Sequence, residues 1–502
     1  MILIIPDVYI LEYIMKDKYH RRLKKVLEEK WGFPELKPKQ MEIIEAIVDK
    51  KRDVIGLLPT GYGKSMTFLI PPLITRKVCI IISPLISLME DQKEKLIERD
   101  IPVAALHGNN FNKDKEIFQI IDGEIHIVYM SPEFLIHGDG LELATTLHND
   151  KMLGLFAIDE AHCTSVWGHD FRNDYLQMGI FRENFPKVPI LAVTATATFP
   201  VVEDIVEYLS LKEPLLVRGD FDRPNLFLKF ENSDGIDVKV VESYIEKYIT
   251  SQPKESEDRI IIYTCSRKDT VELSDEINKK WKKISLAYHA GLSKKMRSMI
   301  QTKFSTGEVK IIVSTIAFGM GIDQTVRCVM IFGAPSSIEE YYQQIGRAGR
   351  DYKPAETILF FQYKRIKIAE SGLSKYTNLK VRQAKAAAYR SMSKLFFLKT
   401  CRRKFILEYF GQIPKFFNCH NCDNCLKFTK DVTKKVYKYL IEDDDLYETF
   451  KDKDITKLKS MDLITVYDKK VKNSLDFIHW KKIIVTNKIN MENMKDKYRI
   501  YI

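Results

Sequence analysis

The sequence predicts an α/β protein with two parallel sheets, followed by a helical metal-binding module and a short, charged tail. Two observations predict this organisation. Short apolar runs recur before Lys364, and each leads through a polar or glycine-rich element into a helical stretch. Near-continuous apolar strands that alternate with helices are typical of parallel sheets buried on both faces. The strand pattern then stops, and a cluster of cysteines predicts the third module.

Eight apolar runs are expected as strands. They are Val54–Leu58, Val78–Ile82, Ile125–Tyr129, Leu153–Ile158, Ile190–Val193, Ile260–Tyr263, Lys310–Val313 and Cys328–Phe332. Ligands of open parallel sheets bind beyond the carboxyl ends of the strands. The polar elements of this chain follow those ends, so the sequence predicts its chemistry there.

Polar stretches and turn signals divide the chain into five parts. We expect an N-terminal extension at 1–30, a first lobe at 31–214, a second lobe at 215–365, a zinc-binding module at 366–428 and a tail at 429–502. The turn-forming segment Arg223-Pro224-Asn225 is expected to be the hinge between the lobes. The tail is short for a winged helix, so at most a reduced one is expected there.

Composition limits the protein class. The chain has 502 residues, of which 45% are hydrophobic, and this is enough to bury sizeable cores. No apolar run reaches the roughly 18–20 residues that span a bilayer. Met1–Met15 lacks the basic start and the cleavage site of a signal peptide. We therefore expect an intracellular, reducing setting, in which the eight cysteines are thiols or metal ligands.

The positive charge is concentrated in one block. Between Lys364 and Lys430 there are 16 Lys and Arg against three acids, a net of +13. The whole chain carries +11, so the remainder sums to −2. Such a block is typical of a protein that binds a polyanion. A solvated helical face is the plainer interpretation of the same charges.

A glycine-rich loop predicts a phosphate site. Thr60, Gly61, Gly63, Lys64 and Ser65 follow an apolar strand and precede an apolar helix. Glycines let backbone N–H groups approach phosphates, the lysine neutralises the β/γ charge and the hydroxyl binds Mg²⁺. The strict pattern begins with glycine, and here that position is Leu58.

Two further elements complete an ATP-hydrolysing site. Asp159 and Glu160 end an apolar strand, where the first can hold Mg²⁺ and the second can activate water. Arg347 and Arg350 lie three residues apart in the second lobe. An arginine supplied from another domain stabilises charge in phosphoryl transfer. Surface charge is the alternative for the two acids, and a nucleic-acid contact or a surface helix is the alternative for the two arginines.

Cys401, Cys419, Cys422 and Cys425 have the spacing C-x17-C-x2-C-x2-C. Close cysteine pairs joined to a distant cysteine suit tetrahedral Zn²⁺ held by four thiolates. The neighbouring His420 is a weaker candidate ligand. Buried thiols or disulfides are the alternatives.

An aromatic loop follows the paired acids within a few residues. Trp167, His169, Phe171 and Arg172 combine rings with a cation, a set that can stack on bases. We expect this loop to report DNA binding to the ATP site, whereas core packing is the competing interpretation.

Taken together, these motifs resemble the RecQ family of superfamily-two DNA helicases, from about Trp31 to Cys425. The segments that carry the resemblance are Trp31-Gly32-Phe33, Ser83–Gln92, Asp159–Cys163, Trp167–Arg172, Thr194–Thr198, Phe221–Leu226, Tyr288–Leu292, Ser314–Asp323, Gln343–Asp351 and Cys419–Cys425. The resemblance implies two RecA-like lobes, with ATP, Mg²⁺ and Zn²⁺ as cofactors. It also implies 3′→5′ translocation and duplex unwinding.

The resemblance also assigns residue roles. It implies that Gln40 reads adenine and that Thr194, Thr196 and Gln343 couple hydrolysis to DNA. The expected partners are single-stranded DNA and tailed or forked duplexes, in a setting of DNA repair or recombination. The expectation includes no membrane partner and leaves the oligomeric state open.

Two alternatives remain at this level. The motor is shared across the superfamily, so an RNA helicase or remodeller fits the lobes equally. A non-enzymatic nucleic-acid-binding or annealing protein with a regulatory ATP site would lack a catalytic group. Lys64, Glu160 and both arginines are present, which argues against the latter.

Overall fold

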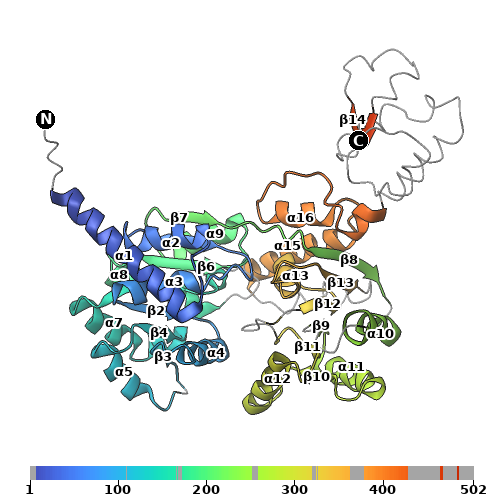
Figure 1. Cartoon of the computed structure of the whole chain (residues 1–502), viewed down its shortest axis with the longest axis horizontal. Coiled ribbons are helices and arrows are strands. Elements are labelled where there is room, and N and C mark those ends of the chain that lie inside the picture. The colour runs from blue at the N-terminus through green and yellow to red at the C-terminus, as the bar shows by residue number, and fades with distance from the viewer. Residues whose placement is uncertain are drawn as a thin grey trace, which may run out of the picture.

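Figure 1 shows the chain as a computed structural model in which two α/β lobes lie side by side. The structure describes residues 7–108, 110–165, 167, 172–233, 235–251, 258–318, 324, 326–361 and 378–427, together with two short strands of the tail. Side chains are described from residue 19 onward. Within this part of the chain, every helix is too short or too polar to cross a lipid bilayer.

The first lobe contains a seven-stranded sheet in the order β3-β4-β2-β5-β6-β1-β7, and all its pairings are parallel. The strands are β1 Val54–Leu57, β2 Val78–Ile82, β3 Val103–Leu106, β4 Ile127–Met130, β5 Leu153–Ile158, β6 Ile190–Thr194 and β7 Leu215–Arg218. Successive residues of β2 enter different cores: Ile80 packs into one cluster and Ile81 into another. The sheet is therefore buried on both faces, as the apolar runs predict.

Helices flank the first sheet. They are α1 Asp7–Trp31, α2 Pro38–Val48, α3 Met66–Thr75, α4 Ile86–Ile97, α5 Lys113–Ile121, α6 Pro132–His137, α7 Gly140–Asn149, α8 Ile180–Asn184 and α9 Phe199–Tyr208, with short 3-10 helices at Ala161–Thr164 and Asn173–Gln177. The predicted N-terminal extension is α1. Its Leu23 and Leu27 pack in one cluster with Ile70 and Ile74 of α3.

One buried carboxylate ties together the amino ends of three strands in the first sheet. Both oxygens of Asp53 lie 2.6 Å from Arg182 Nη2. They also accept from the backbone amides of Ile190 at 2.9 Å and Lys212 at 2.8 Å. Asp53 precedes β1, Ile190 begins β6, and Lys212 lies just before β7. This anchor lies at the strand ends opposite to the glycine-rich loop.

The second lobe contains a six-stranded parallel sheet in the order β10-β11-β9-β12-β13-β8. Its strands are β8 Leu226–Asn232, β9 Arg259–Tyr263, β10 Ser285–Tyr288, β11 Ile311–Ser314, β12 Val326–Phe332 and β13 Ala355–Phe361. Its helices are α10 Val238–Ile245, a π-helical turn at Glu246–Thr250, α11 Arg267–Lys280, α12 Lys294–Thr306 and α13 Ile338–Ile345. Serine side chains cap α11, α12 and α13 by accepting a backbone N–H of the first turn.

The predicted lobe boundary at residue 215 needs correction. Strand β7 begins at Leu215 and pairs with β1, so it belongs to the first sheet. The second sheet begins with β8 at Leu226. The chain therefore crosses between the lobes after Arg218. The prediction placed the boundary too early because a short edge strand carries little apolar pattern and resembles a linker in the sequence.

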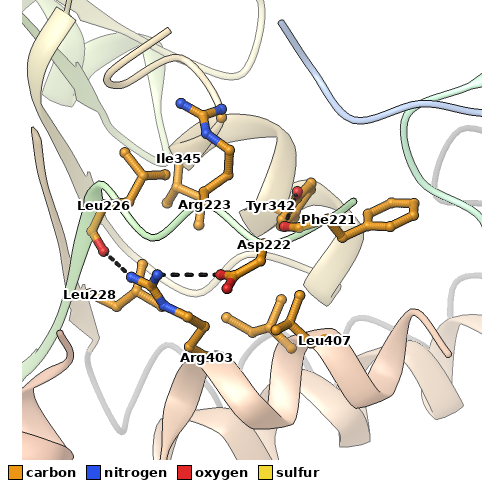
Figure 2. A pocket seen from close by; sticks show the side chains of 11 residues that line it. Phe221, Asp222, Arg223, Leu226, Leu228, Tyr342, Ile345, Arg403 and Leu407 are labelled. Carbon is orange, nitrogen blue, oxygen red and sulfur yellow. Dashed lines mark hydrogen bonds and ion pairs between the residues drawn. The ribbon is translucent and has the colours of Figure 1, made fainter. Parts of the chain in front are cut away.

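The segment that crosses between the lobes is bound on two sides. Arg223 Nη2 donates to the Gly349 carbonyl at 2.7 Å, beside the arginine motif. On the other side, Arg403 donates to the Leu226 carbonyl at 2.5 Å and lies 3.3 Å from Asp222 Oδ1 (Figure 2). The cavity between them measures about 20 Å³, which holds roughly one water. This junction is a packed joint rather than a ligand pocket.

The zinc-binding module contributes α15 Leu379–Phe396 and α16 Arg402–Tyr409, and its described residues end at Lys427. In the tail, β14 Ile464–Val466 and β15 Ile483–Val485 form an antiparallel pair. The remainder of the tail, where at most a reduced winged helix is expected, lies outside the described residues.

Candidate functional site

The glycine-rich loop joins β1 to α3 at the carboxyl edge of the first sheet. Gly61 and Gly63 have φ of +84° and +90°, a region that favours glycine. Lys64 and Ser65 are half-buried where α3 begins, and Ser65 is its N-cap residue. The loop thus presents backbone amides, an ammonium group and a hydroxyl at a helix N-terminus, which suits phosphate and its metal.

Gln40 supports this loop from α2. Its Nε2 donates to the carbonyls of Tyr62 at 3.1 Å and Gly63 at 2.9 Å, and its Oε1 accepts from the Lys37 amide at 2.8 Å. Both ends of this amide are therefore engaged within the protein. The resemblance implies that Gln40 reads adenine. Oε1 can accept a second hydrogen bond from the adenine amino group, whereas donation from Nε2 to adenine requires exchange of one of its two present bonds.

Asp159 and Glu160 follow β5 at the same edge of the sheet. The Glu160 amide donates to Asp159 Oδ1 at 2.9 Å, and Glu160 has φ of +49°. A non-glycine residue in this left-handed region is strained, and such strain is concentrated at functional sites. Burial and the Glu160 charge raise the pKa of Asp159 to about 7, against the opposing effect of the Lys64 charge. The carboxylate is therefore poised to exchange a proton for a cation.

His162 connects the acids to the predicted coupling threonines. Its Nδ1 lies 3.3 Å from Glu160 Oε2 and 2.9 Å from Thr194 Oγ1. The Thr194 hydroxyl in turn accepts from the Thr196 amide at 3.2 Å. Burial lowers the pKa of His162, but Cys163 and Glu160 outweigh it and raise the pKa overall. His162 thus links Glu160 to the end of β6 within the protein interior.

The second lobe reaches the loop through the turn that follows α13. Two glycines show how closely the lobes approach. A Cβ atom added to Gly346 would lie 3.2 Å from Thr60 Cβ, and a Cβ atom added to Gly61 would lie 3.6 Å from Arg350 Cγ. Arg350 therefore lies against the phosphate-binding loop. Arg347 is half-buried near Tyr263. The Arg347 charge lowers the pKa of Tyr263, but the effect of burial is larger and raises it. Gln343 is half-buried on α13, one turn before Arg347.

The aromatic loop is described only in part. Trp167 is 43% exposed, and its amide donates to Ser165 Oγ at 3.1 Å. Arg172 Nη1 donates to the Pro84 carbonyl at 2.5 Å, which connects the end of this loop to the segment after β2. His169 and Phe171 lie outside the described residues. The accessible Trp167 ring remains suited to stacking on a base.

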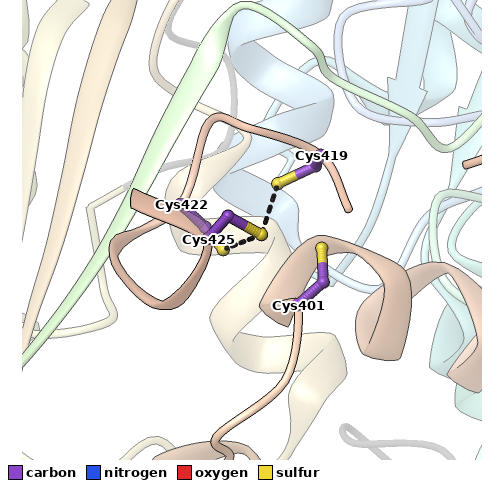
Figure 3. Close-up of side chains that lie close together, drawn as sticks. All are labelled: Cys401, Cys419, Cys422 and Cys425. Atoms are coloured by element: carbon purple, nitrogen blue, oxygen red, sulfur yellow. Dashed lines mark hydrogen bonds between the residues drawn. The ribbon is translucent and has the colours of Figure 1, made fainter. Parts of the chain in front are cut away.

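The four predicted zinc ligands lie together (Figure 3). Their sulfur atoms all lie within 4.8 Å of one another, with Cys419–Cys425 at 3.8 Å and Cys422–Cys425 at 3.3 Å. A tetrahedron with Zn–S bonds of about 2.3 Å has sulfur atoms about 3.8 Å apart. Hydrogen bonds among the thiols lower the pKa of Cys401 and Cys422 and raise the pKa of Cys419 and Cys425, so the four groups share their protons. The cluster fits a closed structural zinc site, and His420 does not belong to it.

The zinc module is fixed to the second sheet. Buried Arg402 pairs with Asp423 at 2.6 Å and lies 4.0 Å from the centre of the Phe230 ring on β8. The Phe230 amide donates to Asp423 Oδ2 at 3.2 Å. Hence movement of the second lobe carries the metal site with it.

Sequence reasoning missed several residues of this site. His162 stands inside the quoted motif Asp159–Cys163, yet only its neighbours are assigned roles from the sequence. Tyr175, whose hydroxyl donates to the Asp159 carbonyl at 3.3 Å, gives no sequence signal. Neither does Glu339, which accepts from the Tyr409 hydroxyl at 2.7 Å.

Three protein families match the chain. Residues 37–205 match the DEAD/DEAH box helicase family, residues 240–352 match the helicase conserved C-terminal domain, and residues 363–426 match the RecQ zinc-binding family.

Curated relatives align over most of the chain. "Putative ATP-dependent RNA helicase R290" of Acanthamoeba polyphaga mimivirus is 39% identical over 83% of this chain and 74% of its own length. ATP-dependent DNA helicase RecQ of Haemophilus influenzae is 35% identical over 80% and 63%. The mouse bifunctional 3'-5' exonuclease/ATP-dependent helicase WRN is 36% identical over 76% and 27%. The chain thus spans under two thirds of the latter two proteins.

Solved helicase structures share the fold. The DUF1998 helicase MrfA bound to DNA and AMPPNP aligns with a TM-score of 0.56 at 19% identity, over 82% of this chain and 59% of that one. Mss116p bound to single-stranded RNA and AMP-PNP aligns with a TM-score of 0.56 at 21% identity, over 80% and 89%. At these identities the likeness concerns the two-lobed architecture alone.

Proposed function

The chain belongs to the RecQ family of superfamily-two helicases, and from this premise we propose that it is an ATP-dependent DNA helicase that translocates 3′→5′ along single-stranded DNA. Its cofactors are ATP, Mg²⁺ and Zn²⁺. The observation that carries the proposal is the approach of Arg350, from the second lobe, to the phosphate-binding loop at Gly61. A site assembled from two lobes changes when the lobes move, and this is how hydrolysis becomes motion.

The residues of the site divide the chemistry between them. The loop amides from Thr60 to Ser65 hold the phosphates, and Lys64 neutralises their charge. Ser65 and Asp159 would hold Mg²⁺, which would neutralise negative charge that develops on the phosphates. Glu160 is placed to orient and deprotonate the attacking water. Each role follows from the side-chain chemistry at the carboxyl edge of the first sheet.

The arginines complete the site from the second lobe. Arg350 stabilises charge on the transferring phosphoryl group, and Arg347 supports it from beside Tyr263. Such an arginine contributes about 10³–10⁵ in kcat in related phosphoryl transfers. Opening of the lobes withdraws it, so turnover depends on lobe closure.

The basic block and the aromatic loop are the proposed DNA contacts. The 364–430 segment carries a net charge of +13, and its described part is docked on the second lobe through α16. Exposed Trp167 lies on the first lobe, joined through the chain to the acids. A strand held on both lobes advances when the lobes close and open. Binding through phosphate contacts should weaken steeply with salt.

RNA is the competing substrate. The mimivirus relative is named as an RNA helicase, whereas the Haemophilus influenzae relative is named as a DNA helicase. Stimulation of ATP hydrolysis by single-stranded DNA and by RNA of equal length and sequence separates the two. We expect DNA to stimulate more strongly, with Lys64→Ala inactive on both. Stronger stimulation by RNA would reject the proposed substrate.

A further inference from the structure

Glu339 is a buried acid at the start of the helix that leads to the arginines. It lies in the first turn of α13, is 4% exposed, and precedes Gln343 by four residues. Residues four apart share a helix face, so Glu339, Gln343 and Arg347 follow one line along α13 and the turn after it. A carboxylate in such a position is costly to bury unless partners compensate its charge.

Only half of this carboxylate is satisfied. Oε1 accepts a hydrogen bond from the Tyr409 hydroxyl at 2.7 Å. Oε2 is buried and meets no hydrogen-bond donor in suitable geometry among the described residues. A buried acceptor without a partner costs about 1–3 kcal/mol, and more when it is charged. Such an atom in a native fold calls for an explanation.

The positive group that acts on Glu339 from the first lobe is His162. Burial raises the pKa of Glu339, and four groups lower it: the Tyr409 hydroxyl, its own backbone amide, the Ser337 hydroxyl and His162. His162 is itself 2% exposed and contacts both Glu160 and Thr194. Glu339 and His162 are both buried, and they interact electrostatically although they come from different lobes.

The other partner, Tyr409, is connected to the zinc site by one helix. Helix α16 has Cys401 as its N-cap residue and ends at Tyr409. Its eight residues span about 12 Å at the usual rise. A helix that is anchored at one end by a metal ligand and at the other by a buried hydrogen bond transmits displacement with little loss.

We propose that Glu339 is a positioning residue that joins the zinc module to the water-activating acid, through Tyr409 on one side and His162 on the other. Lobe closure brings Glu339 Oε2 within hydrogen-bond reach of the His162 imidazole. His162 then holds Glu160 and Thr194 in the orientation used for hydrolysis. Strand binding on the zinc module is thereby coupled to the ATP site. This inference rests on the proposed function, since it requires nucleic-acid-stimulated ATP hydrolysis.

The competing interpretation is a purely structural bond that stabilises the packing of α13 against α16. Two conservative variants separate the two. Glu339→Gln keeps the shape and an acceptor for Tyr409 but removes the charge that faces His162. Tyr409→Phe keeps the ring, which packs 5.3 Å from Phe410 between centroids, and removes the hydroxyl. The neighbouring Glu340→Gln is the matched control, since Glu340 contacts Ser336 and Gln344 instead.

The readout is the ratio of stimulated to unstimulated ATP turnover, measured with the KM for ATP and the zinc content of each full-length variant. We expect Glu339→Gln and Tyr409→Phe each to lower the ratio about tenfold, within the usual range of coupling between sites. The KM for ATP and the zinc content should remain those of the unaltered chain. The double variant should lose no more than the worse single variant, since both act through one link. Glu340→Gln should leave the ratio unchanged.

Three outcomes count against the link. One is an unchanged ratio in both variants while the unaltered chain is stimulated, which leaves the proposed function intact. The second is an additive loss of stimulation in the double variant. The third is a loss of zinc or a raised KM for ATP that accompanies the fall in the ratio, as a structural role predicts. An unaltered chain that hydrolyses ATP without any response to DNA or RNA contradicts the proposed function itself, and the link with it.

Discussion

Asp423→Asn is expected to detach the zinc module from the second lobe while leaving all four cysteines in place. Asp423 is 7% exposed and Arg402 is 4% exposed, so their ion pair is shielded from water. Oδ1 lies 2.6 Å from Arg402 Nε, and Oδ2 accepts from Arg402 Nη2 at 3.0 Å and from the Phe230 amide at 3.2 Å. If the oxygen of an asparagine side chain occupied the Oδ1 position, its NH₂ group would occupy the Oδ2 position. There it would face two donors, Arg402 Nη2 and the Phe230 amide.

The size of the expected destabilisation follows from the unpaired arginine that the substitution leaves in the protein interior. The substitution leaves the Arg402 charge buried without its counter-ion, which typically costs about 3–5 kcal/mol. At about 1.4 kcal/mol per decade, the equilibrium between docked and undocked module shifts by roughly two to four decades. Because both side chains are buried, screening by solvent does not reduce this range.

The assay is the rate at which a chelator removes zinc from the full chain, together with urea unfolding followed by a probe in each lobe. Asp351→Asn is the matched control. Asp351 also pairs with an arginine, Arg327, but it is 29% exposed and Asp258 remains beside that arginine at 3.3 Å. The control should cost less than about 1 kcal/mol. If Asp423→Asn costs no more than the control, the buried pair does not hold the module, and the reasoning fails.

Three further predictions concern the metal and ATP sites. Arg350→Ala should lower kcat for ATP hydrolysis about a thousandfold in phosphate-release assays; a loss below tenfold would remove Arg350 from the site. Cys422→Ser should release about one Zn²⁺ per chain, and full zinc retention would exclude this ligand. Since the pKa of Asp159 is raised to about 7, the Mg²⁺ needed for half-maximal turnover should rise about tenfold per pH unit below 7; a flat profile would contradict its role.

The raised pKa of Asp159 also determines how the stability of the metal-free protein changes with pH. The folded state holds the Asp159 proton up to about pH 7, whereas the unfolded chain releases it near the ordinary value of 3.8. The stabilising contribution is therefore complete below about pH 3.8 and is lost as the pH rises through 7. Mg²⁺ replaces that proton, so the metal should stabilise the fold most above pH 7.

The phosphate and zinc sites could be predicted from the sequence because their chemistry fixes local spacing. Gly61 and Gly63, which precede Lys64, must be near it in sequence to form one phosphate-binding loop. The close cysteines from Cys419 to Cys425 must likewise be near one another to hold one metal ion. The cluster of four sulfur atoms fits the zinc prediction. Eight strands of the two sheets were also readable, since burial on both faces leaves an apolar run with sharp polar ends. Strands β3, β7, β8, β10 and β13 were not predicted.

The residues that connect distant parts gave no such signal. Asp53 and Arg182 are 129 residues apart, and Glu339 and Tyr409 are 70 apart. Pairs of this kind have no periodicity, and each member is individually an ordinary acid, arginine or tyrosine. The edge strand β7 was missed for a related reason, since only Val217 of its four residues is fully buried. Tertiary packing, rather than local pattern, determines all of these.

Unwinding of short DNA duplexes with a 3′ tail, a 5′ tail or no tail, in the presence of Mg²⁺ and ATP, tests the central claim most directly. We expect separation of the 3′-tailed duplex, little separation of the other two, and none with Glu160→Gln or with a non-hydrolysable ATP analogue. Separation that needs no ATP hydrolysis, or that occurs only with a 5′ tail or only on RNA, would contradict the claim.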